Sequence, residues 1–306
     1  MAIYKELSSL VNQLGFSKRT LYSMSNSIQK HYHLVKIPKG NGEYRQLSVP
    51  DEFLKVIQRR INDRLLMDEE ISPYATAYRK GGSTKVNASP HVGNEVLLKL
   101  DIRHFFDGLI YPMVKEKAFP AEKYSEQNRI LLSLLCVGTD ALPQGAPTSP
   151  TISNIIMRDF DNKIGDWCLE RGICYTRYCD DMTFSGNDFE PSEVIKLVKD
   201  ELWSMGLIIN KKKTVVVGKG QRHAVTGIVV NEKVSVNSEY KRKIRQEMHY
   251  CMKYGIDSHL KSIASEKTKC GYVSNLLGRI NYVISVEPDN GKMREYKEWL
   301  QDFYKI

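Results

Sequence analysis

The 306-residue sequence lacks several features that would each assign it to a class of protein. Its six cysteines include no Cys-x-x-Cys pair and no histidines at zinc-site spacing, so a structural zinc site is excluded and reduced thiols are expected. No apolar run reaches membrane length and no signal peptide opens the chain, so we expect a cytoplasmic protein without a membrane partner. Because no repeat or low-complexity block appears, a single globular body is favoured.

The sequence does have a surplus of positively charged residues. The chain has 45 Lys and Arg against 36 Asp and Glu, a formal net charge of +9, and 42% hydrophobic residues. This composition is globular, and the length allows a substantial core. A basic surface gains affinity for phosphate backbones by counterion release. Many basic proteins bind no nucleic acid, so the charge agrees with such a partner without identifying it.

Three aspartates stand at the ends of predicted strands. Asp180 and Asp181 lie between the strand-like runs 174–177 and 182–185, and Asp101 ends the apolar run 96–100. A hairpin turn would hold the adjacent pair in solvent, and three acids on strand ends suggest two-metal phosphoryl transfer. The alternative is structural, because aspartate is common in turns where it bonds its own backbone.

A stiff loop precedes a predicted helix between these acids. Residues 142–150, LPQGAPTSP, contain three prolines and a glycine. Such a loop can line a nucleotide pocket with Gln144, or it can be a connector in which Ser149 or Ser153 caps the helix. The helical pattern that follows is carried by Ile152, Ile155, Ile156, Phe160, Ile164 and Trp167.

In this order the motifs resemble a reverse transcriptase. Asp101 is followed by the aromatic pair Phe105 and Phe106, then by Leu-Pro-Gln-Gly at 142–145 and Tyr-x-Asp-Asp at 178–181. Residues 206–214, GLIINKKKT, are similar to the family's segment after the catalytic hairpin. Asn-Ala-x-x-His at 87–91 and Val-Thr-Gly at 225–227 resemble signatures of bacterial retron reverse transcriptases. The resemblance covers roughly residues 30 to 290.

The fold expected is α+β, a right-hand polymerase with a ferredoxin-like palm, mixed fingers and a helical thumb. The predicted order strand, helix, strand, strand, helix, strand fits such a palm. The expected segments are 1–93 for the fingers with N-terminal helices, 94–111 for the first catalytic palm strand, 112–140 for a helical fingers insertion, 141–230 for the remaining palm and 231–306 for the thumb.

Local patterns predict the elements around the motifs. Helix patterning covers residues 5–30, with Ser17 as a cap, and a further amphipathic helix covers 51–67. Strands at 31–37 and 44–49 flank the Asn-Gly turn of residues 39–43, which resembles the fingers hairpin. A strand is predicted at 225–230, and helices dominate 238–306.

The resemblance implies a two-magnesium site for nucleotidyl transfer. Asp101 and Asp180 are expected to bridge both Mg²⁺ ions, with Asp181 as an accessory ligand and the Ile102 carbonyl as a further oxygen. Mg²⁺ prefers hard oxygen ligands, which these are. All of this requires that folding bring residues 101, 180 and 181 together.

Four residues are expected to bind the incoming dNTP. Arg45 matches the arginine that grips the triphosphate, and Phe106 matches the aromatic gate that rejects a ribose hydroxyl. Gln144 would contact the sugar or the template pair, and Lys213 would protonate the pyrophosphate, although Lys211 and Lys212 leave the register open. An exposed strand arginine and a core aromatic are the alternatives for Arg45 and Phe106, and Phe105 is assigned to packing.

Contacts with structured RNA are expected from two regions. One is the Asn87 and His91 signature, for which a cap or turn is the alternative. The other is a basic cluster at the start of the thumb, for which a solvated helix face is the alternative. This cluster consists of Lys241, Arg242, Lys243 and Arg245.

The expected function is that of a retron-type RNA-directed DNA polymerase. It would copy a cognate structured noncoding RNA into branched RNA-linked DNA (msDNA), starting from a guanosine 2′-hydroxyl, in antiphage (antiviral) defence with a separate effector protein. The alternatives are a group II intron or diversity-generating reverse transcriptase, and an RNA-binding scaffold with a vestigial site.

Overall fold

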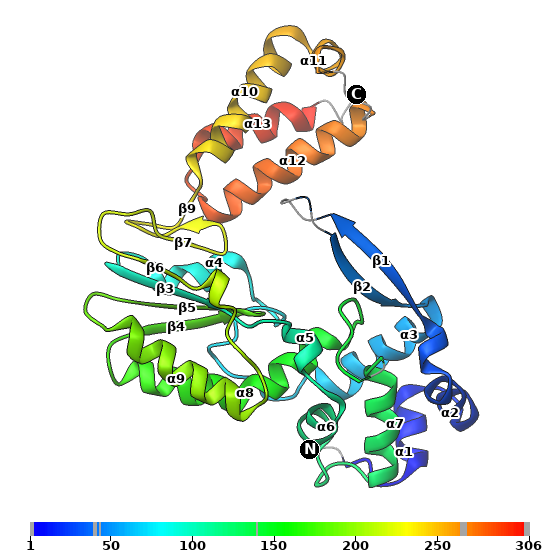
Figure 1. Cartoon of the computed structure of the whole chain (residues 1–306). Helices are drawn as coiled ribbons and strands as arrows, with labels where there is room; N and C mark the ends of the chain where they lie inside the picture. Colours follow the sequence, from blue (N-terminus) through cyan, green and yellow to red (C-terminus); the bar gives the residue numbers. More distant parts are fainter. Residues whose placement is uncertain (1–2, 39–41, 43, 139, 264–267, 303–306) are drawn as a thin grey trace. The chain divides into compact units, whose positions relative to one another are not determined.

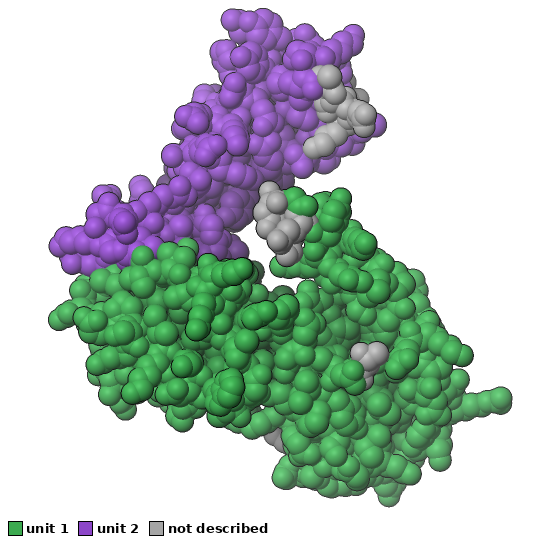
Figure 2. Space-filling view, in the orientation of Figure 1, with its two compact units in different colours: residues 1–82, 96–216 green, residues 83–95, 217–306 purple. Residues whose placement is uncertain are grey.

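The computed structural model describes residues 3–38, 42, 44–138, 140–263 and 268–302. They form two compact units, one of residues 1–82 and 96–216 and one of residues 83–95 and 217–306 (Figure 2). Residues 83–95 and 217–230, which the sequence assigns to fingers and palm, fall in the second unit with the C-terminal helices. The five-part division into fingers, palm and thumb stays a prediction.

A four-stranded sheet forms the centre of the first unit, in the order β4-β5-β3-β6. The strands are β3 (Val96–Asp101), β4 (Cys174–Tyr178), β5 (Asp181–Gly186) and β6 (Val215–Val217). Helices α8 (Ser149–Leu169) and α9 (Pro191–Ser204) lie along one face of this sheet (Figure 1). The chain order β3, α8, β4, β5, α9, β6 together with this strand order confirms the predicted ferredoxin-like palm.

Alternating apolar residues attach the sheet to its helices. Leu98 and Leu100 on β3 are at most 1% exposed, and Met182 and Phe184 on β5 are fully buried in the same core. Because side chains two apart on a strand share a face, these four pack against the same helical layer. Each buried side chain of this size contributes about 1.5–3 kcal/mol, so the sheet face and the helices are firmly joined.

Helices and a hairpin make up the N-terminal part of the first unit. They are α1 (Leu7–Leu14), α2 (Lys18–Asn26), η1 (Ile28–His31), β1 (Tyr32–Pro38), β2 (Tyr44–Pro50), α3 (Glu52–Ile61) and η2 (Asn62–Leu66). The Ser17 hydroxyl accepts the Thr20 amide at 3.1 Å, which confirms the predicted cap. The antiparallel β1–β2 pair confirms the hairpin, whereas its predicted turn at 39–43 lies outside the described residues apart from Gly42.

Short helical elements follow β3. They are α5 (Phe105–Gly108), α6 (Tyr111–Met113), η4 (Val114–Ala118) and α7 (Glu126–Cys136), with η5 (Lys211–Lys213) later in the unit. The strand ends at Asp101, and His104, with φ +50°, turns the chain into α5. The aromatic pair therefore lies on a helical turn and not on a continuing strand.

The second unit combines a small sheet with helices. It contains α4 (Thr84–Ala88), η3 (Ser89–His91), β7 (Ala224–Val225), β8 (Ile228–Val229), β9 (Ser235–Val236), α10 (Ser238–Tyr254), α11 (Ile256–Ser262), α12 (Lys269–Val286) and α13 (Gly291–Asp302). The C-terminal helices confirm the helical pattern predicted there. In the described ranges, no helix is both long and apolar enough to cross a membrane.

The predicted strand at 225–230 is wrong, because the chain reverses inside it. Val225 pairs with Ile228 across a two-residue turn. The turn residues Thr226 and Gly227 have φ values of +46° and +82°. Positive φ at both central positions is the signature of the hairpin turn whose twist matches its strands. The Val-Thr-Gly signature is thus a tight turn between β7 and β8.

Candidate active site

The sheet register brings the predicted acids together. Asp101, the last residue of β3, lies directly opposite Asp181, the first residue of β5. Directly opposed residues of an antiparallel pair have Cβ atoms about 4.5–5.5 Å apart. Asp180 occupies the two-residue turn just before Asp181, and its carbonyl accepts the Ile102 amide at 3.0 Å. Folding therefore gathers residues 101, 180 and 181 at one end of the sheet.

The acidic cluster carries unfavourable like charge. Partial removal of the Asp181 carboxyl from water, together with the charges of Asp180 and Asp101, raises its pKa to about 6. Asp101 is only 3% exposed. Its two carboxylate oxygens accept hydrogen bonds, one from the Lys213 ammonium at 2.6 Å and one from the side-chain amide of Asn210 at 2.9 Å. A cationic group is therefore already drawn to the cluster.

The cluster fits magnesium by its chemistry. Carboxylate oxygens are hard ligands. Burial and, after it, the charges of Asp180 and Asp101 raise the Asp181 pKa, and a divalent cation would relieve the repulsion among these charges. As they stand, no three His, Cys, Asp or Glu side chains within the described residues are grouped to hold a metal ion. The Lys213 ammonium and the Asn210 side-chain amide bond to the two oxygens of Asp101, so a cation that binds these oxygens would have to displace them.

One cavity of about 1670 Å³ contains the acids and the residues expected to bind dNTP. Its wall includes the three aspartates, and all four of the predicted nucleotide residues lie in it too. These four are Arg45, Phe106, Gln144 and Lys213. Residues from the hairpin, the Pro-rich loop and the sheet, far apart in the chain, thus face one space within the first unit.

The Pro-rich loop is fixed against the hairpin. A Cβ on Gly145 would meet the Ser48 carbonyl oxygen of β2 at 3.0 Å, and its φ is +130°. Glycine is the residue that accepts both conditions. The Ser149 hydroxyl donates to the Pro143 carbonyl at 2.9 Å, and the N-cap residue Thr148 makes no side-chain cap. Ser149 and Ser153 are therefore not helix caps, and the neighbouring Gln144 is held at the cavity.

The two aromatic residues differ in burial as expected. Phe105 is 3% exposed within the core, whereas Phe106 is half-buried and faces the cavity, with the ring centroids 5.3 Å apart. Phe105 packs in the core as predicted. Phe106 lines the same cavity as the three aspartates, and its role as a gate stays a prediction.

The segment after α9 brings lysines to the acids. The backbone amide of Asn210 donates to the backbone carbonyl of Asp101 at 2.7 Å, and the backbone amide of Arg103 donates to the backbone carbonyl of Ile208 at 2.9 Å. This pairing lays residues 208–210 beside the end of β3. All three lysines of η5 line the cavity, and Lys213 contacts Asp101. Among these three lysines Lys213 bonds to Asp101, whereas its role toward the pyrophosphate stays a prediction.

The Asn87 and His91 signature lies in the interior of the second unit. Asn87 is 1% exposed and donates to the Thr226 hydroxyl at 3.3 Å, and Thr226 donates to the Thr84 carbonyl at 3.3 Å. His91 is fully buried, and burial lowers its pKa to about 4. This burial argues against the predicted direct contact with RNA, because neither side chain reaches the surface. The signature instead braces the Val-Thr-Gly turn.

The basic cluster at the start of α10 is divided. Lys241 is half-buried and pairs with Glu287 at 2.7 Å, so it is engaged inside its own unit. Lys243 pairs with Glu239 at 3.2 Å across one helical turn. Arg242, Lys243 and Arg245 are exposed. The arginines and Lys243 therefore remain the candidates for contact with a phosphate backbone.

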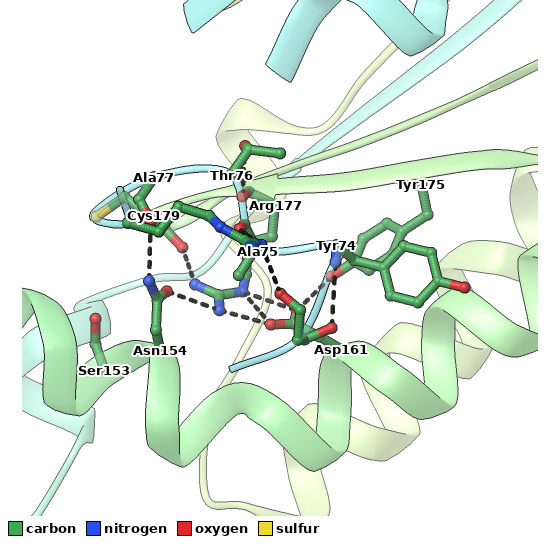
Figure 3. Close-up of polar contacts among 12 residues, drawn as sticks. Tyr74, Ala75, Thr76, Ala77, Ser153, Asn154, Asp161, Tyr175, Arg177 and Cys179 are labelled. Atoms are coloured by element: carbon green, nitrogen blue, oxygen red, sulfur yellow. Dashed lines mark hydrogen bonds and ion pairs between the residues drawn. The ribbon is translucent and has the colours of Figure 1, made fainter. Parts of the chain in front are cut away.

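Sequence reasoning missed a buried polar network next to the turn of residues 179 and 180. Arg177 on β4 is fully buried and pairs with Asp161 of α8 at 2.6 Å (Figure 3). The side-chain oxygen of Asn154, Oδ1, accepts a further hydrogen bond from Arg177 Nη2 at 3.1 Å. The available signal was Asp161 beside Phe160, a charged residue in an otherwise apolar helical stripe.

Backbone strain marks the same region. Among the described residues, the non-glycine residues with positive φ are Tyr78, His104, Cys179 and Thr226. The first three line the cavity. Such conformations cost about 1–3 kcal/mol each and persist where the surroundings enforce them, often at functional sites.

The chain is similar to known proteins over most of its length. Residues 37–250 match the family described as reverse transcriptase (RNA-dependent DNA polymerase). The chain is 34% identical over 274 residues to the retron Ec83 reverse transcriptase of Escherichia coli, covering 84% of each chain. It is 33% identical over 238 residues to the retron Mx65 reverse transcriptase of Myxococcus xanthus, covering 72% of this chain and 56% of that relative's length.

Among solved structures, telomerase from Candida albicans is similar with a TM-score of 0.46 and 12% identity, covering 93% of this chain and 68% of that one. The family match spans more than half of the chain, and the E. coli relative is matched over most of its length. The chain therefore belongs to the reverse transcriptases, the RNA-dependent DNA polymerases, and within them to the retron reverse transcriptases.

Proposed function

We propose that this RNA-directed DNA polymerase copies part of a structured noncoding RNA into DNA that stays joined to the RNA. Synthesis would begin at a guanosine 2′-hydroxyl of the RNA and give branched RNA-linked DNA (msDNA). The observation that carries the proposal is the direct pairing of Asp101 with Asp181 in the cavity that Arg45 and Gln144 also line. Relatives that share the retron name support the choice of RNA partner.

The acids are the proposed ligands of two Mg²⁺ ions. Asp101 and Asp180 would hold both ions, Asp181 would assist, and the Ile102 carbonyl would add an oxygen. Bound Mg²⁺ supplies activation of the attacking hydroxyl and neutralisation of the polyphosphate. Lys213 pairs with Asp101 at 2.6 Å and carries a raised pKa because of that bond, so it is charged when a nucleotide enters.

The remaining cavity residues would orient the nucleotide. Arg45 can grip triphosphate oxygens through two parallel hydrogen bonds. The attacking hydroxyl would release its proton to water as its oxygen bonds to the α-phosphorus, and the bond between that phosphorus and the pyrophosphate oxygen would break. Lys213, released from Asp101, would give a proton to the departing pyrophosphate. Phe106 would exclude a 2′-hydroxyl, and Gln144 would contact the sugar or the template pair.

RNA recognition is proposed for the exposed part of α10. Arg242, Lys243 and Arg245 would bind phosphates and 2′-hydroxyls of an RNA stem. Such binding weakens steeply with salt because counterions are released. The pair that Lys241 makes with Glu287 removes that lysine from the proposal.

The cellular setting is proposed from family membership. We place the reaction in the bacterial cytoplasm, in antiphage defence with a separate effector protein. The six cysteines are all free thiols, which suits a reducing compartment.

Primer extension on RNA templates tests the proposal. The wild-type protein should extend a DNA primer with dNTPs and Mg²⁺, and Asp180→Asn should lose the activity while keeping its thermal unfolding temperature within a few degrees. Nucleic acid that co-purifies from the native operon should contain RNA-linked DNA. Equal extension by both proteins would overturn the catalytic assignment, and the absence of RNA-linked DNA would overturn the retron reaction.

A further inference from the structure

The turn that carries Asp180 is held by hydrogen bonds in addition to those that pair β4 with β5. Its two residues, Cys179 and Asp180, expose carbonyl groups that a hairpin tip usually gives to water. Here the Cys179 carbonyl accepts Arg177 Nη1 at 2.9 Å, and the Asp180 carbonyl accepts the Ile102 amide at 3.0 Å. Cys179 has φ +63°, a conformation that is costly without glycine. The turn therefore depends on these contacts.

Arg177 links the turn to helix α8. Its guanidinium makes bonds of 2.6–3.0 Å to both oxygens of Asp161 and one of 3.1 Å to Asn154. The Tyr175 hydroxyl donates to Asp161 at 2.8 Å, so the carboxylate is fully engaged. Figure 3 shows the guanidinium between the helix and the turn. One side chain thus spans from a rigid helix to the backbone beside Asp180.

The segment at 74–78 supports the same turn from a second side. Thr76 donates its amide and hydroxyl to the Arg177 carbonyl, at 2.9 and 3.0 Å. Asn154 donates to the Ala77 carbonyl at 2.9 Å, and the Tyr78 hydroxyl donates to the Cys179 sulfur at 3.2 Å. These bonds join α8, this segment and the turn.

Stability alone does not account for the buried pair. Taking two charges out of water costs several kcal/mol per ion, and well-packed apolar residues often replace such pairs without loss. Arg177 and Asp161 are both 0% exposed, so they carry this cost in full. What an apolar pair would lack is the donor to the Cys179 carbonyl.

We propose that Arg177, Asp161 and Asn154 are positioning residues that fix the turn and thereby place Asp180 relative to Asp101. Helix α8 also begins with Ser149, whose hydroxyl donates to the Pro143 carbonyl next to Gln144. The same helix therefore contacts both the turn that carries Asp180 and the Pro-rich loop that carries Gln144. The inference deepens the proposed function and rests on it, because the place of Asp180 matters when it is a metal ligand.

Lysine cannot replace the arginine in this role. The Arg177→Lys side chain keeps the charge and can pair with Asp161. Its single ammonium lacks the planar fork that reaches the carboxylate, Asn154 and the Cys179 carbonyl together. The conservative variant should therefore keep the fold and release the turn.

The test compares full-length wild type with Arg177→Lys, Asn154→Ala and the control Ser153→Ala. Ser153 lies on the same helix, is equally buried, and donates instead to the Pro150 carbonyl. Hydrogen exchange is followed at residues 178–181 and at Ile102, whose amide bonds the turn. Mn²⁺ binding to the protein with an RNA template and DNA primer is measured by electron paramagnetic resonance, and kcat and KM for dNTP by primer extension.

For Arg177→Lys we expect faster exchange at the turn and at Ile102, and Mn²⁺ affinity weaker by roughly 10-fold. A kcat reduced by roughly 10²-fold is expected with KM for dNTP nearly unchanged, because small displacements of reacting groups are costly. Asn154→Ala should shift the same readouts less, and Ser153→Ala should shift none. Wild-type exchange and Mn²⁺ affinity in Arg177→Lys would overturn the inference.

Two further outcomes are also decisive. If Arg177→Lys does not fold, Asn154→Ala carries the comparison, and wild-type turn exchange in that folded variant would overturn the inference. If the wild type itself extends no primer, the proposed function fails. The exchange data then still decide whether Arg177 holds the turn, so the two failures are distinguishable.

Discussion

A methyl group at Gly145 would test how tightly the Pro-rich loop is fitted against β2. In Gly145→Ala the new Cβ would lie 3.0 Å from the Ser48 carbonyl oxygen and 3.3 Å from Val49 Cγ2, at a φ of +130°. Ser48 is paired with Leu34 in the hairpin, so its backbone cannot move aside alone. Either the hairpin or the loop must shift.

The magnitude follows from two separate costs. The backbone conformation costs a residue with a side chain about 1–3 kcal/mol, and overpacking adds about 1–3 kcal/mol. We expect Gly145→Ala to lower the free energy of unfolding by roughly 2–6 kcal/mol, the sum of the two costs. Gly206 is the matched control, because its φ is +74° and no heavy atom lies within 4 Å of its Cβ position. Gly206→Ala should cost about 1–2 kcal/mol, from the backbone alone.

Thermal unfolding and primer extension measure the two consequences. Gly145→Ala should unfold several degrees below Gly206→Ala. Its KM for dNTP should rise, roughly 10-fold, because Gln144 moves with the loop while the acids stay in place. If the two variants have the same unfolding temperature and the same KM, the loop is not seated on β2 as described, and the argument about Gln144 fails with it.

Two other predictions use single side chains. Burial lowers the pKa of His91 to about 4, so the folded state favours the neutral imidazole. The free energy of unfolding should therefore fall by up to about 3 kcal/mol as the pH is lowered from 6.5 to 4. Urea unfolding across this range should show that slope in the wild type and a reduced one in His91→Met; equal slopes would contradict the buried neutral imidazole. Phe106→Ala should raise incorporation of ribonucleotides relative to deoxynucleotides by roughly 10- to 100-fold in primer extension. Unchanged selectivity would remove Phe106 from the gate position.

Strand ends and turns were predictable because they depend on local pattern. The apolar run before Asp101 and the runs around Asp180 predicted β3, β4 and β5 nearly to the residue. The sequence motifs required only that residues 101, 180 and 181 come together; they did not predict the direct pairing of Asp101 with Asp181, because nothing local sets which strands become neighbours. Lys213 could be singled out from its two neighbours only after residues 208–210 were seen beside β3.

Other features were hidden by patterns that suit two structures. The apolar residues at 225–230 are as typical of one continuous strand as of a tight hairpin. The reversal depends on positive φ at Thr226 and Gly227. Arg177 alternates with apolar neighbours as an exposed strand residue would. Its burial depends on Asp161, sixteen residues earlier in the chain, which is a matter of tertiary packing.

The bond between Asn87 and Thr226 has a practical consequence for exchanging parts between related enzymes. Residues 83–95 belong to the same compact unit as residues 217–306, although the chain leaves that unit between them. A chimera made by transplanting residues 217–306 alone would separate the donor Asn87 from the acceptor Thr226 at this bond. A chimera that takes both segments from the same parent keeps this hydrogen bond, so the exchanged unit consists of two stretches that are separate in the sequence.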